Sequence, residues 1–340
     1  MILVTGGTGL VGSHLLYHLA LRHSKIRAIY RKKTSLKNVK HVFSYYFDKP
    51  NELFKKIEWV EAELGDIPRL SSAFAGVNTV YHCAALVSFN PKDYHKMRNT
   101  NIKGTANMVN LSLSFSVKKF CYVSSIATLE NMLNATLITE DNYWNDAKNK
   151  GYAITKYGAE QEVWRGSQEG LEVVIVNPGV IIGPGFWHLG SGKIFSNIYH
   201  GFNFYTNGVT GFVGVNDVAK AMIALTERDI NLERFILVSE NLNFKQVFDW
   251  IADALKVKKP SIKITKWLAE IVWRLDYLKC FFSGKPPLFT KEIAKSSQLK
   301  VYYNAAKIKE LLQFEFTPIY KVIKTTATKY IFDLNINYEG

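Results

Sequence analysis

The chain has 340 residues, of which 47% are hydrophobic and 14% aromatic, and it carries a formal net charge of +14. This length and composition allow a large buried core and suit one α/β domain with a second, smaller lobe. The lysines are spread along the chain rather than gathered beside aromatic or glycine-rich modules. This distribution indicates a generally basic surface that steers anionic ligands, and it disfavours nucleic-acid binding.

The sequence predicts a cytoplasmic protein. A strand is expected to begin at Ile2, which leaves no room for a signal or transit peptide, and no run of about eighteen uncharged apolar residues predicts a membrane span. The three cysteines, Cys83, Cys121 and Cys280, lack the C-x-x-C spacing and indicate buried thiols in a reducing compartment.

The first fourteen residues, MILVTGGTGLVGSH, join a strand at Ile2–Val4 to a helix at Leu10–Arg22 through a glycine-rich turn. The turn contains both G-x-G-x-x-G and G-x-x-G-x-x-G spacings. Absent side chains let such a turn tighten and approach a pyrophosphate, while the helix N-terminus offers free N–H groups to its negative charge. We expect a dinucleotide to bind here, with contacts from Gly6, Thr8, Gly9, Leu10 and Val11.

The second expected strand, Ile26–Tyr30, ends at three cations, Arg31, Lys32 and Lys33. An acidic residue at this place would bind the ribose 2′-hydroxyl of NAD, whereas positive charge accommodates the 2′-phosphate of NADP. The next carboxylate along the chain is Asp48. The sequence therefore favours NADP over NAD, with Arg31 and Lys32 as contacts, and the alternative is that these cations form a solvated loop.

The third and fourth strands are expected at Ile57–Glu61 and Val77–His82. Asp66-Ile67 follows the third strand, where the carboxylate can accept a hydrogen bond from the adenine amino group. The fourth strand ends in small residues that suit backbone lying against the dinucleotide: Cys83, Ala84 and Ala85.

Strands and helices continue to alternate, which is the pattern of an α/β, Rossmann-type, doubly wound parallel sheet with helices on both faces. Further strands are expected at Lys119–Ser124, Val173–Asn177 and Arg234–Ser239, and long helices at Asp93–Ser114 and Tyr152–Glu169. The rhythm changes after Pro178. We expect a cofactor-binding domain at residues 1–177 with a return segment at about 211–240, and a mostly helical C-terminal substrate lobe at 178–210 and 241–340.

A candidate catalytic group follows the fifth strand. Ser125 comes directly after it, and Tyr152 and Lys156 lie four residues apart, on one face of the next helix. A lysine ammonium at this spacing can lower the pKa of the phenol while the phenol reaches a substrate oxygen. The Y-x-x-x-K spacing also occurs at Tyr45/Lys49, Tyr303/Lys307 and Tyr320/Lys324. Only Tyr152 follows a strand ending in Ser-Ser, which places all three groups at the carboxyl edge of the sheet.

Several segments together carry a family resemblance. They are TGGTGLVG, Gly65-Asp66, Cys83–Ala85, NIKGT at Asn101–Thr105, Ser124-Ser125, YAITK, NPGVIIGPG at Asn177–Gly185 and FVGVNDVAKA at Phe212–Ala221. Over nearly its whole length the chain resembles the extended short-chain dehydrogenase/reductase (NAD-dependent epimerase/dehydratase) family. The tract ITEDNYWNDAKNKGYAITKYGAE and the later PLFTKEIAKSSQLKVYYNAAKIKELLQFEFTPI are most similar to its branch of dihydroflavonol reductases, cinnamoyl-CoA reductases and 3β-hydroxysteroid dehydrogenases.

The resemblance implies roles for individual residues. It implies that Tyr152 is the general acid/base, that Lys156 binds the nicotinamide ribose and tunes Tyr152, and that Ser125 hydrogen-bonds the reacting carbonyl. It further implies that Asn101 supports the proton relay. The nicotinamide end would be lined by Pro178, Gly179, Val180 and Ile181.

The sequence therefore predicts an NADP(H)-dependent oxidoreductase that reduces a ketone or aldehyde, or oxidises the alcohol, of a small, fairly apolar substrate. The alternative is a nucleotide-sugar epimerase or dehydratase with tightly bound NAD(P). The sequence disfavours this alternative because Ile182-Gly183-Pro184 stands where such enzymes usually have an aromatic residue before Gly-Pro. A third class, a cofactor sensor without catalysis, is disfavoured by the intact Ser-Tyr-Lys set.

Further predictions concern partners and metals. The two long helices could pair across a homodimer, as they do in relatives. For Ile264–Phe282, packing onto the substrate lobe is favoured over contact with a membrane surface. We predict no metal site, because His14 and His18, at i and i+4, have no acidic or cysteine partner near them in the sequence.

Overall fold

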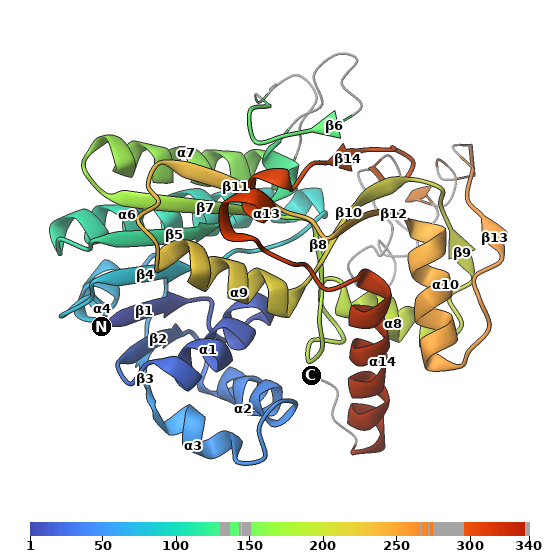
Figure 1. The fold of residues 1–340 in the computed structure, drawn as a ribbon, viewed down its shortest axis with the longest axis horizontal. Coiled ribbons are helices and arrows are strands. Elements are labelled where there is room, and N and C mark those ends of the chain that lie inside the picture. The colour runs from blue at the N-terminus through green and yellow to red at the C-terminus, as the bar shows by residue number, and fades with distance from the viewer. Residues whose placement is uncertain are drawn as a thin grey trace.

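Seven parallel strands form the central sheet, in the order β11-β7-β5-β4-β1-β2-β3 (Figure 1). The computed structural model describes residues 1–129, 137–142, 144, 151–265, 267–268, 270, 273–274 and 296–336. The strands are β1 (Ile2–Thr5), β2 (Ile26–Tyr30), β3 (Ile57–Glu61), β4 (Thr79–His82), β5 (Lys119–Val123), β7 (Glu172–Pro178) and β11 (Glu233–Leu237). The order reverses between β1 and β4, so the predicted doubly wound sheet is confirmed.

Alternate residues of β5 and β7 enter two separate cores. In β5, Phe120 and Tyr122 belong to one core, whereas Cys121 and Val123 belong to the other. Side chains of a strand point alternately to its two faces, so a sheet covered on both sides needs apolar residues at nearly every position. This explains the near-continuous apolar strands.

Helices cover both faces of the sheet (Figure 1). One face packs against α1 (Leu10–Arg22), α2 (Leu36–Ser44), α3 (Pro50–Lys55), α9 (Val215–Thr226) and α13 (Ala306–Leu312). The other face packs against α4 (Ile67–Ser72), α6 (Gly104–Ser114) and α7 (Tyr152–Gln168). The return segment therefore contributes α9, which lies against α1, and β11, which ends the central sheet.

The expected single helix at Asp93–Ser114 is wrong in detail. The structure has a 3-10 turn at Pro91–Asp93, α5 at Tyr94–Met97 and a π-helical stretch at Arg98–Lys103 before α6 begins. A π-helical turn holds more residues than an α-helical turn and often occurs at functional sites. Asn101 lies in this stretch. Elsewhere the expected elements match to within about two residues; β5, for example, ends at Val123 rather than Ser124.

The lobe beside the sheet is built around a three-stranded sheet of β8 (Val180–Ile182), β10 (Val209–Gly214) and β12 (Glu240–Asn243). Its core is closed by α8 (Gly192–Tyr199), α10 (Phe244–Leu255) and α14 (Ile319–Asn335). Four short strands form two further pairs: β9 (Phe204–Tyr205) with β13 (Ile262–Lys263), and β6 (Leu137–Ile138) with β14 (Tyr302–Tyr303).

One buried carboxylate joins this lobe to the central domain. Asp333 of α14 accepts hydrogen bonds from Tyr45 and, at 2.7 Å, from Trp187 Nε1, and it lies 2.8 Å from His41 Nε2. His41 belongs to α2, and Tyr45 is the first residue after that helix. The end of α14 is thereby fixed to the segment that follows the predicted NADP-binding loop.

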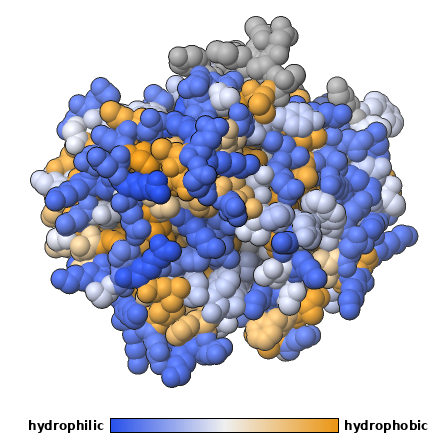
Figure 2. Space-filling view, in the orientation of Figure 1, coloured by the Kyte–Doolittle hydropathy of each residue, from blue (hydrophilic) through white to orange (hydrophobic). Residues whose placement is uncertain are grey.

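Surface features agree with a protein whose apolar residues are mostly internal. The face shown in Figure 2 is covered mainly by hydrophilic side chains, with smaller apolar groups between them. Among the described residues no helix is long and apolar enough to cross a membrane. Within Ile264–Phe282, Ile264 is buried and packs against Phe204, while Trp267 is 74% exposed. Most of that segment, with Cys280, lies outside the described residues.

Candidate functional site

The predicted cofactor residues gather at the carboxyl edge of the central sheet. The glycine-rich turn follows β1, and Cys83, Ala84 and Ala85 follow β4, its neighbour across the reversal in strand order. Ser125 follows β5, and Pro178 ends β7. Ligands of doubly wound sheets bind at this position, because the loops on the two sides of the reversal diverge and leave a crevice.

The glycine-rich turn has the shape of a phosphate cradle. A Cβ on Gly6, which has φ +66°, would lie 2.6 Å from Ala84 N, and one on Gly12 would lie 2.2 Å from Gly6 O. Both positions therefore require glycine. A Cβ on Gly9 would meet only Gly6 O, at 3.4 Å, so this side of the turn is open. Because α1 starts there without a side-chain cap, its first N–H groups are available to a pyrophosphate, and the turn fits a nicotinamide dinucleotide.

The expected adenosine end is a small hollow of about 120 Å³. Its lining residues are Arg31, Glu61, Ala62, Glu63, Asp66 and Arg69. Asp66 caps α4 by accepting a hydrogen bond from Arg69 N at 3.2 Å, and its carboxylate lies 3.5 Å from Arg69 Nε. Sequence reasoning missed Arg69, although the spacing of an N-cap and a third helical residue was available as a signal.

The same hollow corrects one argument from the sequence. Asp48 is the next carboxylate after Arg31 along the chain, but Glu61 and Glu63 lie closer in space, because β3 is the neighbour of β2. The 2′-position of a bound ribose would thus lie near both arginine and carboxylate side chains. The preference for NADP stays a prediction.

Ser125 and Tyr152 are brought together. Ser125 lies two residues beyond β5, and its Oγ accepts a hydrogen bond from Ala127 N at 3.1 Å. Tyr152 is the first residue of α7. Burial raises the pKa of Tyr152 to about 12, and a hydrogen bond with the Ser125 side chain acts in the opposite direction. A phenol with this pKa is protonated at neutral pH.

Lys156 lies one turn further along α7 and is 2% exposed. Its Nζ donates to Tyr122 OH at 2.8 Å and to Val123 O at 2.6 Å. Burial lowers the pKa of Lys156 to about 7, opposed by Glu160 and Cys83. The shift of Tyr152 arises from burial and Ser125, so the expected tuning of Tyr152 by Lys156 stays a prediction.

A buried carboxylate that sequence reasoning missed lies below this group. Glu160, one turn after Lys156, accepts hydrogen bonds from Ser124 Oγ, from Thr128 Oγ1 at 2.9 Å and from Asn177 Nδ2 at 3.1 Å. Ser124 and Thr128 lie on either side of Ser125 in the sequence, so Glu160 fixes residues 124–128 to α7. Its four-residue spacing from Lys156 was the only local signal.

Arg234 of β11 balances this charge. Its Nη1 lies 3.2 Å from Glu160 Oε1, while Nε and Nη2 donate to the backbone oxygens of Glu140 and Asn142 at 2.7 and 3.0 Å. Trp144, beside that segment, stacks on Tyr157 with ring centroids 4.2 Å apart. Through Glu160, Arg234 therefore connects residues 124–128 to Glu140 and Asn142, which precede α7.

Asn101 ties the loop after β4 to α7. Its Nδ2 donates to Leu86 O and to Thr155 Oγ1, each at 3.0 Å, and its Oδ1 accepts from Leu86 N at 2.7 Å. These contacts position the loop that carries Cys83 to Ala85. A part in a proton relay stays a prediction, as does the contact of Pro178 to Ile181 with a nicotinamide.

The other Y-x-x-x-K tyrosines lie elsewhere. Tyr45 donates to Asp333 at the lobe junction, Tyr303 is in β14, and Tyr320 is on α14 with its ring near Trp250. In the i, i+4 histidine pair, His14 Nδ1 lies 2.9 Å from Leu10 O and His18 Nε2 lies 3.0 Å from Asn216 Oδ1. The part of the chain that the structure describes has no cluster of three His, Cys, Asp or Glu residues that could hold a metal ion.

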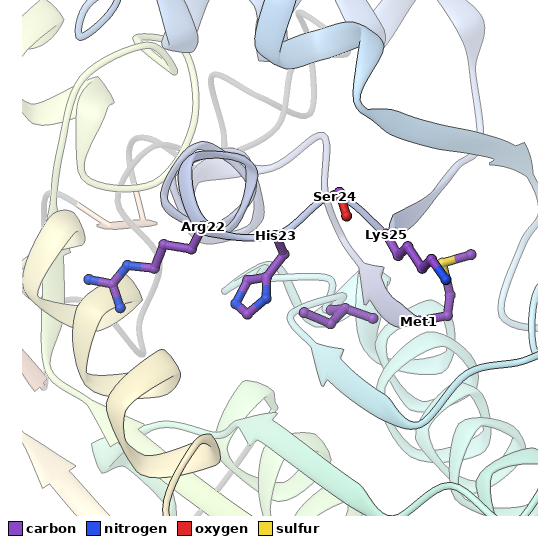
Figure 3. Close-up of a pocket in the computed structure, with 6 residues that line it drawn as sticks. Met1, Arg22, His23, Ser24 and Lys25 are labelled. Carbon is purple, nitrogen blue, oxygen red and sulfur yellow. The ribbon is translucent and has the colours of Figure 1, made fainter.

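A second hollow, of about 270 Å³, lies at the opposite edge of the sheet (Figure 3). It is lined by Met1, Ile2, Arg22, His23, Ser24 and Lys25. Arg22 and His23 reach Glu227, at 3.9 and 3.3 Å. This hollow adjoins the start of β1, whereas the glycine-rich turn follows its end, so it belongs to a different edge from the candidate site.

Comparisons with known proteins show the family and the fold. A family model described as Male sterility protein matches residues 4–232. A putative dihydroflavonol 4-reductase from Synechocystis sp. is 26% identical over 314 residues, covering 89% of this chain and 87% of its own. Anthocyanidin reductase from Arabidopsis thaliana is 27% identical over 272 residues, covering 73% and 78%. The solved structure of a nucleoside-diphosphate-sugar epimerase from Pseudomonas aeruginosa has a TM-score of 0.78 at 18% identity, with 98% and 97% covered, and is similar in fold.

Proposed function

We propose that this chain, which belongs to the Male sterility protein family of extended short-chain dehydrogenases/reductases, is an NADP(H)-dependent reductase of small, fairly apolar ketones or aldehydes. The family establishes an NAD(P)-dependent enzyme with a nicotinamide cofactor, as the motifs predicted. We further propose the choice of NADP over NAD, the catalytic residues, the two-domain division and the substrate class.

The convergence of Ser125, Tyr152 and Lys156 beside the glycine-rich turn carries the proposal. A bound nicotinamide cofactor supplies the hydride for the carbonyl carbon. Ser125 would hold the carbonyl oxygen, and Tyr152 would give that oxygen its proton. Because burial raises the pKa of Tyr152 to about 12, its phenol is in the form that carbonyl reduction needs. Lys156 would bind the ribose through its ammonium.

NADP is supported by the cations at the adenosine end. Arg31 and Arg69 line the hollow there, and Lys32 follows Arg31 directly. An arginine can form a bidentate, charge-assisted pair with a phosphate. Cofactor binding would fall to residues 1–177 with about 211–240, and substrate binding to 178–210 and 241–340.

An apolar substrate is supported by the surroundings of Tyr152. The Phe89 ring lies 6.0 Å from the Tyr152 ring, between centroids, and Phe89 is 39% exposed. An exposed aromatic ring beside the reacting phenol suits an apolar substrate. Relatives named for reduction of dihydroflavonol and anthocyanidin support the same class. A cytoplasmic location and a homodimer formed through α6 and α7 complete the proposal.

A substrate screen tests the function. Purified protein with NADPH is offered ketones, aldehydes, and UDP- and TDP-sugars, while absorbance follows NADPH oxidation and chromatography follows products. We expect stoichiometric NADPH oxidation with an apolar carbonyl compound, abolished by Tyr152→Phe. Conversion of a nucleotide sugar without net NADPH consumption would instead establish an epimerase or dehydratase.

A further inference from the structure

A buried tyrosine holds the ammonium of Lys156. Tyr122 of β5 is 1% exposed, and its hydroxyl accepts a hydrogen bond from Lys156 Nζ at 2.8 Å. The same Nζ lies 4.4 Å from the centre of the Tyr122 ring. A buried ammonium needs acceptors to replace water, and Tyr122 supplies one beside the carbonyl oxygen of Val123.

The contact is the end of a longer buried chain. Tyr122 is hydrogen-bonded to the Thr105 side chain. Thr105 Oγ1 lies 3.0 Å from His82 Nε2, and His82 Nδ1 lies 2.6 Å from Thr5 Oγ1. Thr5 Oγ1 in turn accepts from Ala84 N at 3.3 Å. Thr5 directly precedes the glycine-rich turn, so the chain runs from the catalytic helix to the cofactor cradle.

The hydrogen-bonded side chains that link Lys156 to Thr5 are electrically neutral. Burial, assisted by the charge of Lys156, lowers the pKa of His82 to about 3, so its imidazole carries no proton charge near neutrality. Burial also raises the pKa of Tyr122. The other titratable groups that act on Lys156 are Glu160, on its own helix, and Cys83, whose thiol pKa is raised by burial. Tyr122 is therefore a neutral acceptor whose hydrogen bond favours the charged form of Lys156.

We propose that Tyr122 is a positioning residue, which holds the Lys156 ammonium and, through Thr105, His82 and Thr5, fixes it relative to the glycine-rich turn. The inference rests on the proposed function, because it takes Lys156 to bind the cofactor ribose. Without the Tyr122 hydroxyl, the ammonium loses one of its two acceptors, so Lys156 gives up its proton at lower pH.

The sheet offers a matched control on its other face. Tyr81 of β4 is also 1% exposed, and its hydroxyl is likewise hydrogen-bonded to a threonine, Thr226. Tyr81 belongs to the core shared with α9, whereas Tyr122 belongs to the core shared with α7. Tyr81→Phe therefore removes the same group at the same depth without touching Lys156.

The test is the pH dependence of NADPH affinity, measured by fluorescence titration. In the wild type, affinity should fall as pH rises and Lys156 loses its charge. Loss of a hydrogen bond to a charged group shifts the pKa of that group by about one to two units. We expect Tyr122→Phe to move the fall to lower pH by about one unit, and Tyr81→Phe to leave its position unchanged. Thermal melts should show similar losses of stability for both variants.

Two further variants keep the test decisive if Tyr122→Phe does not fold. Thr105→Val should move the fall in NADPH affinity to lower pH by a smaller amount. Thr105→Ser keeps the hydroxyl and should leave the fall at its wild-type pH. If folded Tyr122→Phe and Tyr81→Phe have the same pH midpoint, or if Thr105→Val equals the wild type, the positioning role is overturned. If the wild type binds neither NADPH nor NADH, the proposed function itself fails.

Discussion

The two ends of the proposed cofactor site are built differently. At the nicotinamide end Lys156 is 2% exposed, and its Nζ donates to the buried Tyr122 hydroxyl and to Val123 O. At the adenosine end the side chain of Arg69 is 65% exposed and that of Asp66 38%. Charges near solvent are screened by water and salt, whereas buried charges act strongly and must be paired. The buried end therefore suits chemistry, and the exposed end suits recognition.

Tyr152→Phe should have the largest effect. It removes the proposed proton donor, and general acid catalysis contributes about 10²–10⁴-fold to a rate. We expect kcat to fall by about 10³-fold while NADPH affinity, set by other residues, stays within about twofold. Steady-state kinetics and calorimetric titration measure the two quantities.

Tyr303→Phe and Tyr320→Phe are its controls, because both tyrosines carry the Y-x-x-x-K spacing but lie in β14 and α14. Both variants should turn over substrate at near wild-type rates. A comparable loss in either folded variant would show that the buried end has been assigned to the wrong tyrosine.

Glu160→Gln tests whether the buried end depends on its charge pairing. The variant leaves Arg234 with a partly buried, uncompensated charge, and breaking a buried pair costs about 3–5 kcal/mol. We expect the free energy of unfolding to drop by about 3 kcal/mol and kcat to fall roughly tenfold, because the Ser125 segment loosens. Denaturant unfolding and kinetics check both.

The control for Glu160→Gln is Asp253→Asn, which breaks an exposed pair with Lys259. Exposed pairs contribute little to stability because solvent and salt screen them, so little change is expected. Equal losses of stability in the two variants would remove the distinction between buried and exposed pairs in this protein.

A third prediction concerns pH. Burial lowers the pKa of Lys156 from 10.5 to about 7 in the folded protein. Between these values the unfolded chain binds a proton that the folded chain does not, so this residue makes stability rise with pH, by at most about 1.4 kcal/mol per unit. Unfolding free energies at pH 7 and 9 should rise more in the wild type than in Lys156→Met. Parallel curves would show that Lys156 is not held in a desolvated site.

The smallest effects are expected at the exposed end. The wild type should prefer NADPH to NADH by about tenfold to a hundredfold, and Arg31→Ala or Arg69→Ala should each lower NADPH affinity by about tenfold. The losses should shrink at high salt. Lys25→Ala, at the opposite edge of the sheet, is the control. Equal or tighter binding of NADH by the wild type would contradict the assignment.

The sequence alone determined the parts that depend on local patterns. The glycine spacing before α1, the alternation of apolar strands with helices, and the four-residue interval from Tyr152 to Lys156 are each contained within a short segment. Backbone geometry and helix periodicity act over the same short range. The Rossmann-type sheet and the position of the candidate catalytic group could therefore be predicted from these patterns.

Only the tertiary structure decided what surrounds these residues. Glu160 and Arg234 are 74 residues apart, Thr5 and His82 are 77 apart, and His41 and Asp333 are 292 apart. Glu61 and Glu63 line the same hollow as Arg31 because β3 lies beside β2. Such pairs are created when strands and helices pack, and a single sequence carries no periodicity that links them. The local pattern predicted the candidate catalytic residues, and packing determined which buried residues surround them.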